Sequence, residues 1–179
     1  MLEPFPEFEF DDFTLREVQI EDGEEFFRYL NDPKVSKYVA TSDIPTSIES
    51  ARNEMAYWRN LYYAGASIYW AIADKATNKL IGTGGFNYWN KQYKRIEISY
   101  DIAPPYWNRG IATRTVDAIT TFGINTLGAQ RVQATVVKDN VRSIKVLEKC
   151  GYKREGLLCK YTILHGKSKD SYMYAKLSE

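Results

Sequence analysis

The sequence is poor in the residues that build metal and redox sites. Among 179 residues it has one histidine, His165, and two cysteines, Cys150 and Cys159, with no Cys-x-x-Cys pair. Zinc sites need several such ligands at short spacings, so no metal site is expected. We expect two free thiols, buried or half-buried, in a reducing cytoplasm. Two cysteines are nevertheless enough to form one disulfide, so their number alone does not exclude it. We interpret His165 as a turn residue and not as a catalytic base.

Net charge and long apolar runs are lacking as well. The formal net charge is +1, whereas a protein that binds nucleic acid relies on a basic surface, so no direct nucleic-acid partner is expected. No apolar run reaches the length of a membrane span, and the acidic residues 1–12 contain no basic segment typical of a secretory signal. We therefore expect a cytoplasmic protein without a membrane partner, in which residues 1–12 form a loose arm.

The remaining chain has the composition of one ordinary globular domain. Hydrophobic residues make up 44% and charged residues 26%, and no internal repeat or linker interrupts residues 13–179. Apolar and β-branched runs predict about seven strands, at residues 13–20, 67–73, 80–88, 94–102, 130–137, 152–164 and 168–177. Amphipathic periodicity predicts about four helices, at residues 23–31 and 48–63 and after Gly110 and Asn140. This order predicts an α+β or mixed α/β fold.

The segment from Glu97 to Thr113 predicts an anion site. An extended run ends at Pro104-Pro105, and Arg109-Gly110 then precede an amphipathic helix. The first N–H groups of a helix have no partner within the helix, and the helix dipole favours negative charge there. Gly110 has no Cβ, so the backbone can approach a bulky phosphate. The segment lacks the Gly-Lys-Ser/Thr ending of a P-loop and the Gly-x-Gly-x-x-Gly of a dinucleotide site.

Several motifs together resemble one family. They are Ile81-Gly-Thr-Gly-Gly-Phe, Ile96-Glu-Ile-Ser-Tyr-Asp-Ile, Tyr106-Trp-Asn-Arg-Gly-Ile-Ala-Thr and Asn140-Val-Arg-Ser-Ile-Lys-Val-Leu-Glu-Lys-Cys-Gly-Tyr. Over about residues 13–177 the chain resembles a GCN5-related N-acetyltransferase (GNAT) of the RimJ/RimL-like branch, which acetylates ribosomal proteins. The family's phosphate loop, Gln/Arg-x-x-Gly-x-Gly/Ala, matches at Gly110 and Ala112, but its first position is Trp107 here.

The resemblance implies a single-domain GNAT-like fold in which two central parallel strands, residues 94–102 and 130–137, splay apart. Acetyl-CoA would lie in the gap as a co-substrate, with its pyrophosphate on the backbone of residues 108–113 and its pantetheine arm along residues 100–102. The coenzyme-binding residues that it implies are Tyr100, Asp101, Ile102, Trp107, Asn108, Arg109, Gly110, Ile111, Ala112, Thr113, Asn140 and Ser143. A homodimer is left open.

Two residues are candidates for catalysis of acetyl transfer to an amine. Glu97 lies between Ile96 and Ile98, where a half-buried carboxylate could accept the amine proton. Strand alternation also places Glu97, Ser99 and Asp101 on one face, so a solvent-facing glutamate paired with a basic neighbour is the alternative. By resemblance Ser143 protonates the departing thiolate or orients the thioester, although it also suits the N-terminal turn of a helix that Asn140 caps.

An aromatic-rich set remains open between two roles. These residues suit either the wall of an acceptor cleft or the hydrophobic core, and they are Tyr57, Trp58, Tyr62, Tyr63, Tyr88 and Trp89. Most aromatic stripes at helical spacing belong to a core. For Tyr152 and Tyr161 a core or surface role is favoured.

The function predicted is an N-acetyltransferase that moves an acetyl group from acetyl-CoA directly to a primary amine, which is a protein N-terminus, a peptide or a small molecule. The alternative is an acyl-CoA-binding sensor with little turnover.

Overall fold

The computed structural model describes residues 4–179 and contains one eight-stranded sheet with five α-helices. The strands are β1 (Phe8–Glu9), β2 (Phe13–Glu17), β3 (Tyr69–Asp74), β4 (Leu80–Asn90), β5 (Arg95–Ile102), β6 (Arg131–Val137), β7 (Lys153–Leu164) and β8 (Lys167–Leu177). The helices are α1 (Gly23–Leu30), α2 (Pro33–Ser36), α3 (Ile48–Tyr63), α4 (Ile111–Asn125) and α5 (Val141–Lys149), with 3-10 turns η1 (Ile20–Asp22), η2 (Thr41–Asp43) and η3 (Pro104–Tyr106).

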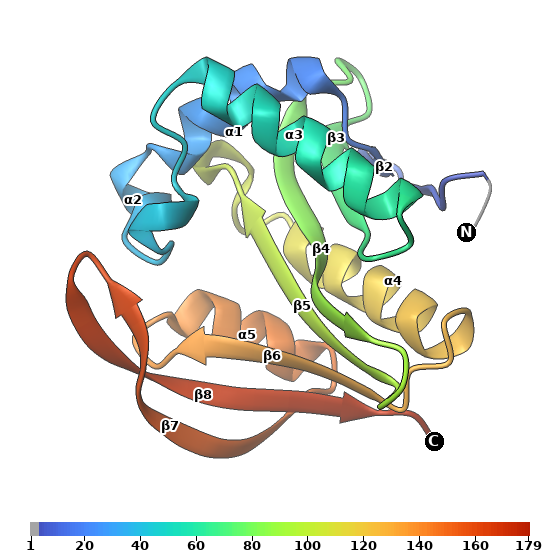
Figure 1. Ribbon diagram of the computed structural model, residues 1–179, viewed down its shortest axis with the longest axis vertical. Coiled ribbons are helices and arrows are strands. Elements are labelled where there is room, and N and C mark those ends of the chain that lie inside the picture. Colours follow the sequence, from blue (N-terminus) through green and yellow to red (C-terminus); the bar gives the residue numbers. More distant parts are fainter. Residues whose placement is uncertain (1–3) are drawn as a thin grey trace.

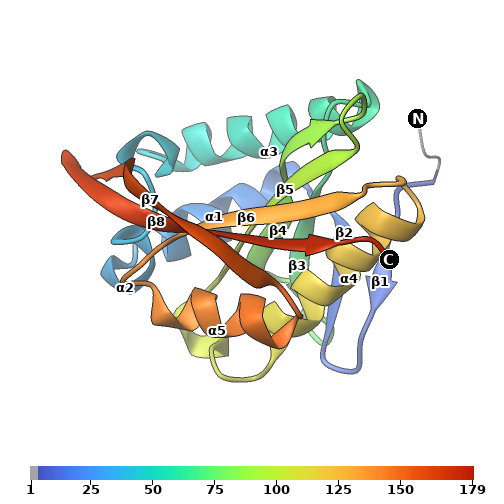
Figure 2. The ribbon, with the colours of Figure 1, turned by 90° about the horizontal axis from the view of Figure 1, so that it is seen from below.

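Helices cover both faces of the sheet. The strand order is β1-β2-β3-β4-β5-β6-β8-β7, and only the β5–β6 pair is parallel among the described strands. Helices α4 and α5 lie on one face, whereas α1 and α3 lie on the other (Figure 2). The main core lies between the sheet and α4, where Trp70, Phe86 and Ile119 are fully buried. This three-layer arrangement leaves the ends of the central strands open to a ligand.

The two central strands separate soon after they begin. Strands β5 and β6 pair only from Arg95 opposite Arg131 to Glu97 opposite Gln133. Beyond this point β5 continues to Ile102 and β6 to Val137 along diverging paths (Figure 1). The predicted splayed pair is therefore present, and the inner edge of β5 beyond Glu97 has no strand beside it.

Local sequence signals explain where the site-forming helices begin. Helix α3 begins after Ser47, whose hydroxyl accepts from the Ser50 N–H in a capping box. Helix α5 begins after Asn140, whose side chain accepts from the Ser143 N–H. Helix α4 begins after Gly110, which has the left-handed φ of +74°.

Three details of the sequence prediction are corrected. The sheet has eight strands rather than seven, because Phe8–Glu9 pairs with β2, and five helices rather than four. The N-terminal arm is not loose over its described residues, since the Pro6 carbonyl accepts a 2.6 Å bond from the Trp70 indole. The unpredicted helix is α2, in which Asp32 is the N-cap and Pro33 occupies the first turn.

The two cysteines differ in exposure. Both are free, but Cys150 is buried whereas Cys159 is exposed, which departs from the expectation of two buried or half-buried thiols. His165 lies in the turn between β7 and β8, as expected. Among the helices described, none is both long and apolar enough to cross a membrane.

Candidate active site

One cavity, here called the coenzyme cavity, gathers most of the residues predicted to bind the coenzyme. It has a volume of about 490 Å³ and lies between the end of β5, the start of α4 and helices α2 and α5. Eleven of the twelve predicted residues line it: Tyr100, Asp101, Ile102, Trp107, Asn108, Gly110, Ile111, Ala112, Thr113, Asn140 and Ser143. Arg109 is outside the lining, and its guanidinium lies 5.1 Å from the centre of the Tyr106 ring.

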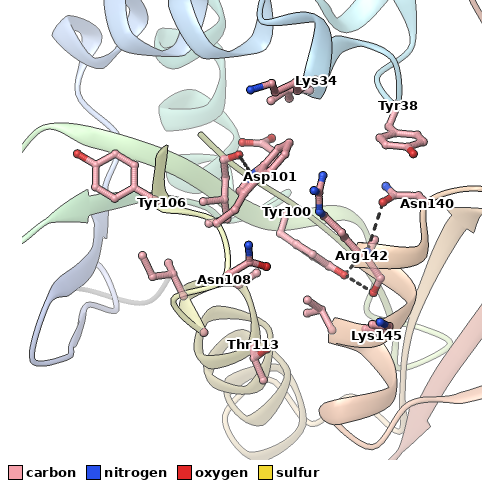
Figure 3. A pocket seen from close by; sticks show the side chains of 18 of the residues that line it. Lys34, Tyr38, Tyr100, Asp101, Tyr106, Asn108, Thr113, Asn140, Arg142 and Lys145 are labelled. Carbon is pink, nitrogen blue, oxygen red and sulfur yellow. Dashed lines mark hydrogen bonds between the residues drawn. The ribbon is translucent and has the colours of Figure 1, made fainter. Parts of the chain in front are cut away.

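The coenzyme cavity suits an anionic ligand. An added Cβ at Gly110 would meet no heavy atom within 4 Å, so the start of α4 is open on this side. Four cationic side chains, Lys34, Arg142, Lys145 and Lys149, also line the cavity. Figure 3 shows Lys34 and Arg142 reaching it from different elements. Unpaired helix N–H groups together with cations suit the phosphates of a coenzyme.

Trp107 has a structural role that the family pattern does not predict. Its indole N–H donates to the Ile102 carbonyl over 2.7 Å, which ties the η3 loop to the end of β5. The Arg142 guanidinium lies 4.3 Å from the centre of the Trp107 ring. The residue that replaces the family's Gln or Arg therefore holds both the strand end and a cation beside the cavity.

A second cavity, here called the acceptor cavity, adjoins the first. It has a volume of about 860 Å³. Four members of the aromatic set, Tyr57, Trp58, Tyr88 and Trp89, line it. Tyr62 is instead buried in the core, and Tyr63 is exposed and donates to Glu17. Four members of the set thus line a cavity, whereas one lies in the core and one is exposed.

The two cavities adjoin and share part of their lining. Six residues line both of them: Tyr38, Val39, Tyr100, Asp101, Asn140 and Ser143. These residues come from the α2 region, from β5 and from the start of α5. Two of the shared residues, Tyr100 and Asp101, lie on the part of β5 that has separated from β6.

Ser143 and the phenol of Tyr100 meet at this junction. The two hydroxyl oxygens are 2.7 Å apart, and either can be the donor, because the Tyr100 phenol can direct its single proton either to Ser143 Oγ or to the Ser143 carbonyl oxygen 3.1 Å away. Figure 3 shows Tyr100 pointing from β5 toward the start of α5. Burial raises the pKa of Tyr100 well above its usual range, so the phenol is a neutral donor at physiological pH. When this phenol donates to Ser143 Oγ, the serine proton is free to point into the cleft.

Asp101 is the carboxylate at the junction. Its Oδ1 accepts from the Tyr29 hydroxyl at 2.5 Å and from the Thr83 N–H at 3.1 Å, and its Oδ2 accepts from the Thr83 hydroxyl at 3.0 Å. Burial raises the pKa of Asp101 to about 6, although the hydrogen bonds from Tyr29 and Thr83 oppose this shift. The carboxylate thus joins α1 to β4 and β5 beside the cleft.

Glu97 lies behind the wall of the cleft rather than in it. It lines neither cavity, and its Oε2 accepts from the Gln133 amide at 2.8 Å. Its Oε1 is 3.4 Å from the hydroxyl of Thr135, and Thr135 lines the acceptor cavity. The structure therefore does not bring Glu97 and Ser143 to one cavity, but a single threonine separates Glu97 from the acceptor cavity.

Sequence reasoning missed several residues of the cleft. Lys34 and Tyr38 come from α2 and the residues after it, which the Asp-Pro pair could have indicated as a helix start. Tyr100 and Asp101 were expected to bind the coenzyme, but their side-chain contacts could not be expected, because resemblance does not show which way a strand side chain points. Thr135 carried no motif.

Comparison with known proteins agrees with this geometry. The family model of the acetyltransferase (GNAT) domain matches residues 12–153. The N-acetyltransferase YoaA of Bacillus subtilis (strain 168) is 32% identical over 171 residues, which are 96% of each chain. The ribosomal-protein-S5-alanine acetyltransferase of Vibrio fischeri superposes with a TM-score of 0.88 at 21% identity over 97% of each chain. The microcin C7 self-immunity acetyltransferase MccE, solved with acetyl-CoA and AMP, gives 0.84 at 24% identity over 94% of each chain.

The chain belongs to the GNAT family of acetyl-CoA-dependent acetyltransferases, because the family model covers most of its length. The likeness to a ribosomal-protein acetyltransferase agrees, at the level of the fold, with the expected RimJ/RimL-like branch.

Proposed function

We propose that the protein transfers the acetyl group of acetyl-CoA directly to a primary amine while both substrates are bound. The observation that carries this proposal is that the two cavities adjoin and share six lining residues. One cavity is lined by cations and opens beside a helix N-terminus, whereas the other is lined by aromatic rings and carboxylates. A cleft of this kind can hold two different ligands end to end.

Acetyl-CoA supplies the thioester whose carbonyl carbon the amine attacks. In our proposal the N-terminal turn of α4 and the cations Lys34, Arg142, Lys145 and Lys149 hold the phosphates. The free edge of β5 at Tyr100–Ile102 offers backbone groups to the pantetheine amides, in the manner of an added strand. Asn140 caps helix α5 with its side chain and also lines both cavities.

The attacking amine must be neutral. With a reference pKa of about 8, roughly a tenth of an α-amine is neutral at pH 7, and a lysine-like amine with a pKa of about 10.4 is almost wholly charged. We propose that the amine proton passes through a water or the Thr135 hydroxyl to Glu97, which lies behind Thr135. Asp101 is the competing acceptor because it lines both cavities.

The departing thiolate needs a proton or a hydrogen bond. Ser143 Oγ lines both cavities and has Tyr100 as its neighbour at 2.7 Å. We propose that Ser143 donates to the thiolate and that the phenol of Tyr100 donates in turn to Ser143 Oγ. The two free cysteines take no part, and they support our placement of the protein in the reducing cytoplasm.

Initial-rate kinetics test the direct transfer. Acetyl-CoA and an amine acceptor would be varied together, and thiol release would be measured. Transfer in a ternary complex gives intersecting double-reciprocal lines, whereas an acetyl-enzyme intermediate gives parallel lines. Tight binding of acetyl-CoA without transfer to any amine in a broad panel of peptides, polyamines and amino acids would instead favour the sensor.

A further inference from the structure

The charged residues that line the two cavities are of opposite sign. Four cations and the shared Asp101 line the coenzyme cavity. The acceptor cavity is lined by three carboxylates, Asp43, Glu54 and Asp101, and by no lysine, arginine or histidine among the described residues. A cavity that lacks a cation has no partner for a carboxylate on its ligand, and bringing like charges together in it is unfavourable.

The three carboxylates differ in their hydrogen bonds: Asp101 accepts three from Tyr29 and Thr83, whereas Asp43 accepts one from Ser42. Within residues 4–179, none of them forms an ion pair with a protein cation. Glu54 is half-buried on α3, and burial raises its pKa; a hydrogen bond with Trp58 opposes this rise, and the charge of Asp43 adds to it. A cation bound beside Glu54 and Asp43 would offset the cost of burying the Glu54 carboxylate and the repulsion between the two carboxylates. Glu54 and Asp43 therefore form a place for positive charge that the protein leaves unmatched.

Aromatic rings line the same cavity as these two carboxylates. Trp58 and Tyr69 stack with their ring centres 4.5 Å apart, and both line the acceptor cavity. Burial raises the pKa of Tyr69 to about 12, and the nearby charges of Glu54, Tyr57 and Asp43 act in the same direction. Rings next to carboxylates are the surroundings in which proteins bind ammonium groups, through cation–π attraction and ion pairing.

The position of the carboxylates indicates two separate charge sites. Asp101 lines both cavities and is therefore beside the point of transfer, whereas Asp43 and Glu54 line only the acceptor cavity. An acceptor whose reacting amine lies at the junction would extend away from the coenzyme toward Glu54 and Asp43. Its far end would meet negative charge and aromatic faces.

Resting on the proposed function, we propose that the acceptor is an amine that carries a second positive charge at its far end and no carboxylate. Glu54 and Asp43 bind the second charge, and the rings of Trp58 and Tyr69 contact the apolar part between the charges. Free amino acids are excluded because their carboxylate would enter a cavity that offers it no cation.

A matched set of three acceptors tests the proposal. Pentylamine, 1,5-diaminopentane and 6-aminohexanoate have similar length and a reacting amine of similar type, and they end in a methyl group, an ammonium and a carboxylate. We expect kcat/KM to be highest for the diamine and lowest for the amino acid. The value for the diamine should exceed that for pentylamine about tenfold, because one charge-assisted contact contributes about 1.4 kcal/mol. Equal values, or a preference for the carboxylate, would overturn the proposal.

Two variants test the residues. Glu54→Gln should reduce the preference for the diamine over pentylamine about tenfold, mainly through a higher KM for the diamine. Glu49→Gln, an exposed change on the same helix outside the cavity, should keep the preference. An unchanged preference in Glu54→Gln and in Asp43→Asn would overturn the assignment.

The outcomes also separate this proposal from the proposed function. Acetylation of a neutral peptide α-amine without acetylation of the diamine would overturn the charge-based selection alone. Acetyl-CoA binding without acetylation of any amine would overturn both.

Discussion

The two halves of the cleft differ in how their residues are distributed along the chain. Almost all of the coenzyme cavity comes from two short stretches, residues 100–113 and 140–149, whereas the acceptor cavity draws residues from α1, η2, α3, four central strands and β7. A ligand that is held by helix ends and strand backbone needs a local motif. A ligand that is held by side chains from many elements leaves no such motif in the sequence.

The largest effect is expected on acetyl-CoA affinity, at the start of α4, where the coenzyme cavity is built from a short local segment. Gly110→Asp places a side chain at a φ of +74° and adds negative charge at the start of α4, where our account places phosphate. Acetyl-CoA affinity should fall by at least about a hundredfold, which corresponds to about 2.7 kcal/mol. The measurement is the rise in Tm caused by acetyl-CoA, which should vanish.

Gly128→Asp is the matched control for this change. Gly128 follows α4, has a similar φ of +68°, and likewise has no heavy atom within 4 Å of an added Cβ, but it lines neither cavity. The control should lose stability yet keep its response to acetyl-CoA. An intact response in Gly110→Asp would remove the phosphate site from the start of α4.

The next largest effect concerns proton transfer on the acceptor side. Glu97→Gln keeps the shape of the side chain but removes the proton acceptor, and loss of a general base costs ~10²–10⁴-fold. The loss should shrink as pH rises, because the amine is then already neutral. A pH profile of kcat/KM checks this, with the exposed Glu49→Gln as control.

The same pH profile distinguishes Asp101 from Glu97. Burial holds the pKa of Asp101 near 6, so this carboxyl keeps its proton below about pH 6 and loses it above. If Asp101 were the acceptor, activity would rise as pH passes about 6 and Asp101→Asn would abolish that rise. A wild-type rate and pH dependence in Glu97→Gln would contradict our assignment.

A smaller effect is expected at the junction of the two halves. Ser143→Ala should lower kcat about a hundredfold, the lower end of the range for proton donors, with little change in acetyl-CoA affinity. Tyr100→Phe should lower kcat less, because it removes only the donor behind Ser143. If both variants together cost no more than Ser143→Ala alone, the two residues act as one unit. Full activity of Ser143→Ala would exclude it as the donor.

The cysteines should show no catalytic effect. Burial raises the pKa of Cys150 to about 11, so its thiol remains protonated and weakly nucleophilic at neutral pH. The exposed Cys159 lies in β7, outside both cavities. Cys159→Ser should therefore retain the wild-type rate, and mass spectrometry of a single turnover should find neither thiol acetylated. An acetylated cysteine would contradict direct transfer.

The order of most elements could be predicted from the sequence because periodicity and caps are local. Helix α3 has the predicted bounds of Ile48 and Tyr63, and the splayed strands lie within two residues of their predicted ends. The short elements β1 and α2 were missed because two or four residues show no periodicity.

The candidate site was predictable to a different extent in its two halves. Residues 100–102 and 107–113 were assigned through helix-end chemistry and resemblance, and all of them except Arg109 line the coenzyme cavity. The contact between Tyr100 and Ser143, and the place of Glu97 behind Thr135, depend on which way strand side chains point after β5 and β6 separate. No local signal in the sequence carries that direction.

The most direct test of the account is a crystal structure of the protein with coenzyme A. We predict that the pyrophosphate lies against the backbone of residues 108–113, that the pantetheine arm runs along β5, and that the sulfur lies at the junction near Ser143 Oγ. The acceptor cavity should remain free for a second ligand. A coenzyme whose sulfur lies away from the residues shared by the two cavities, or whose body fills the acceptor cavity, would contradict the account.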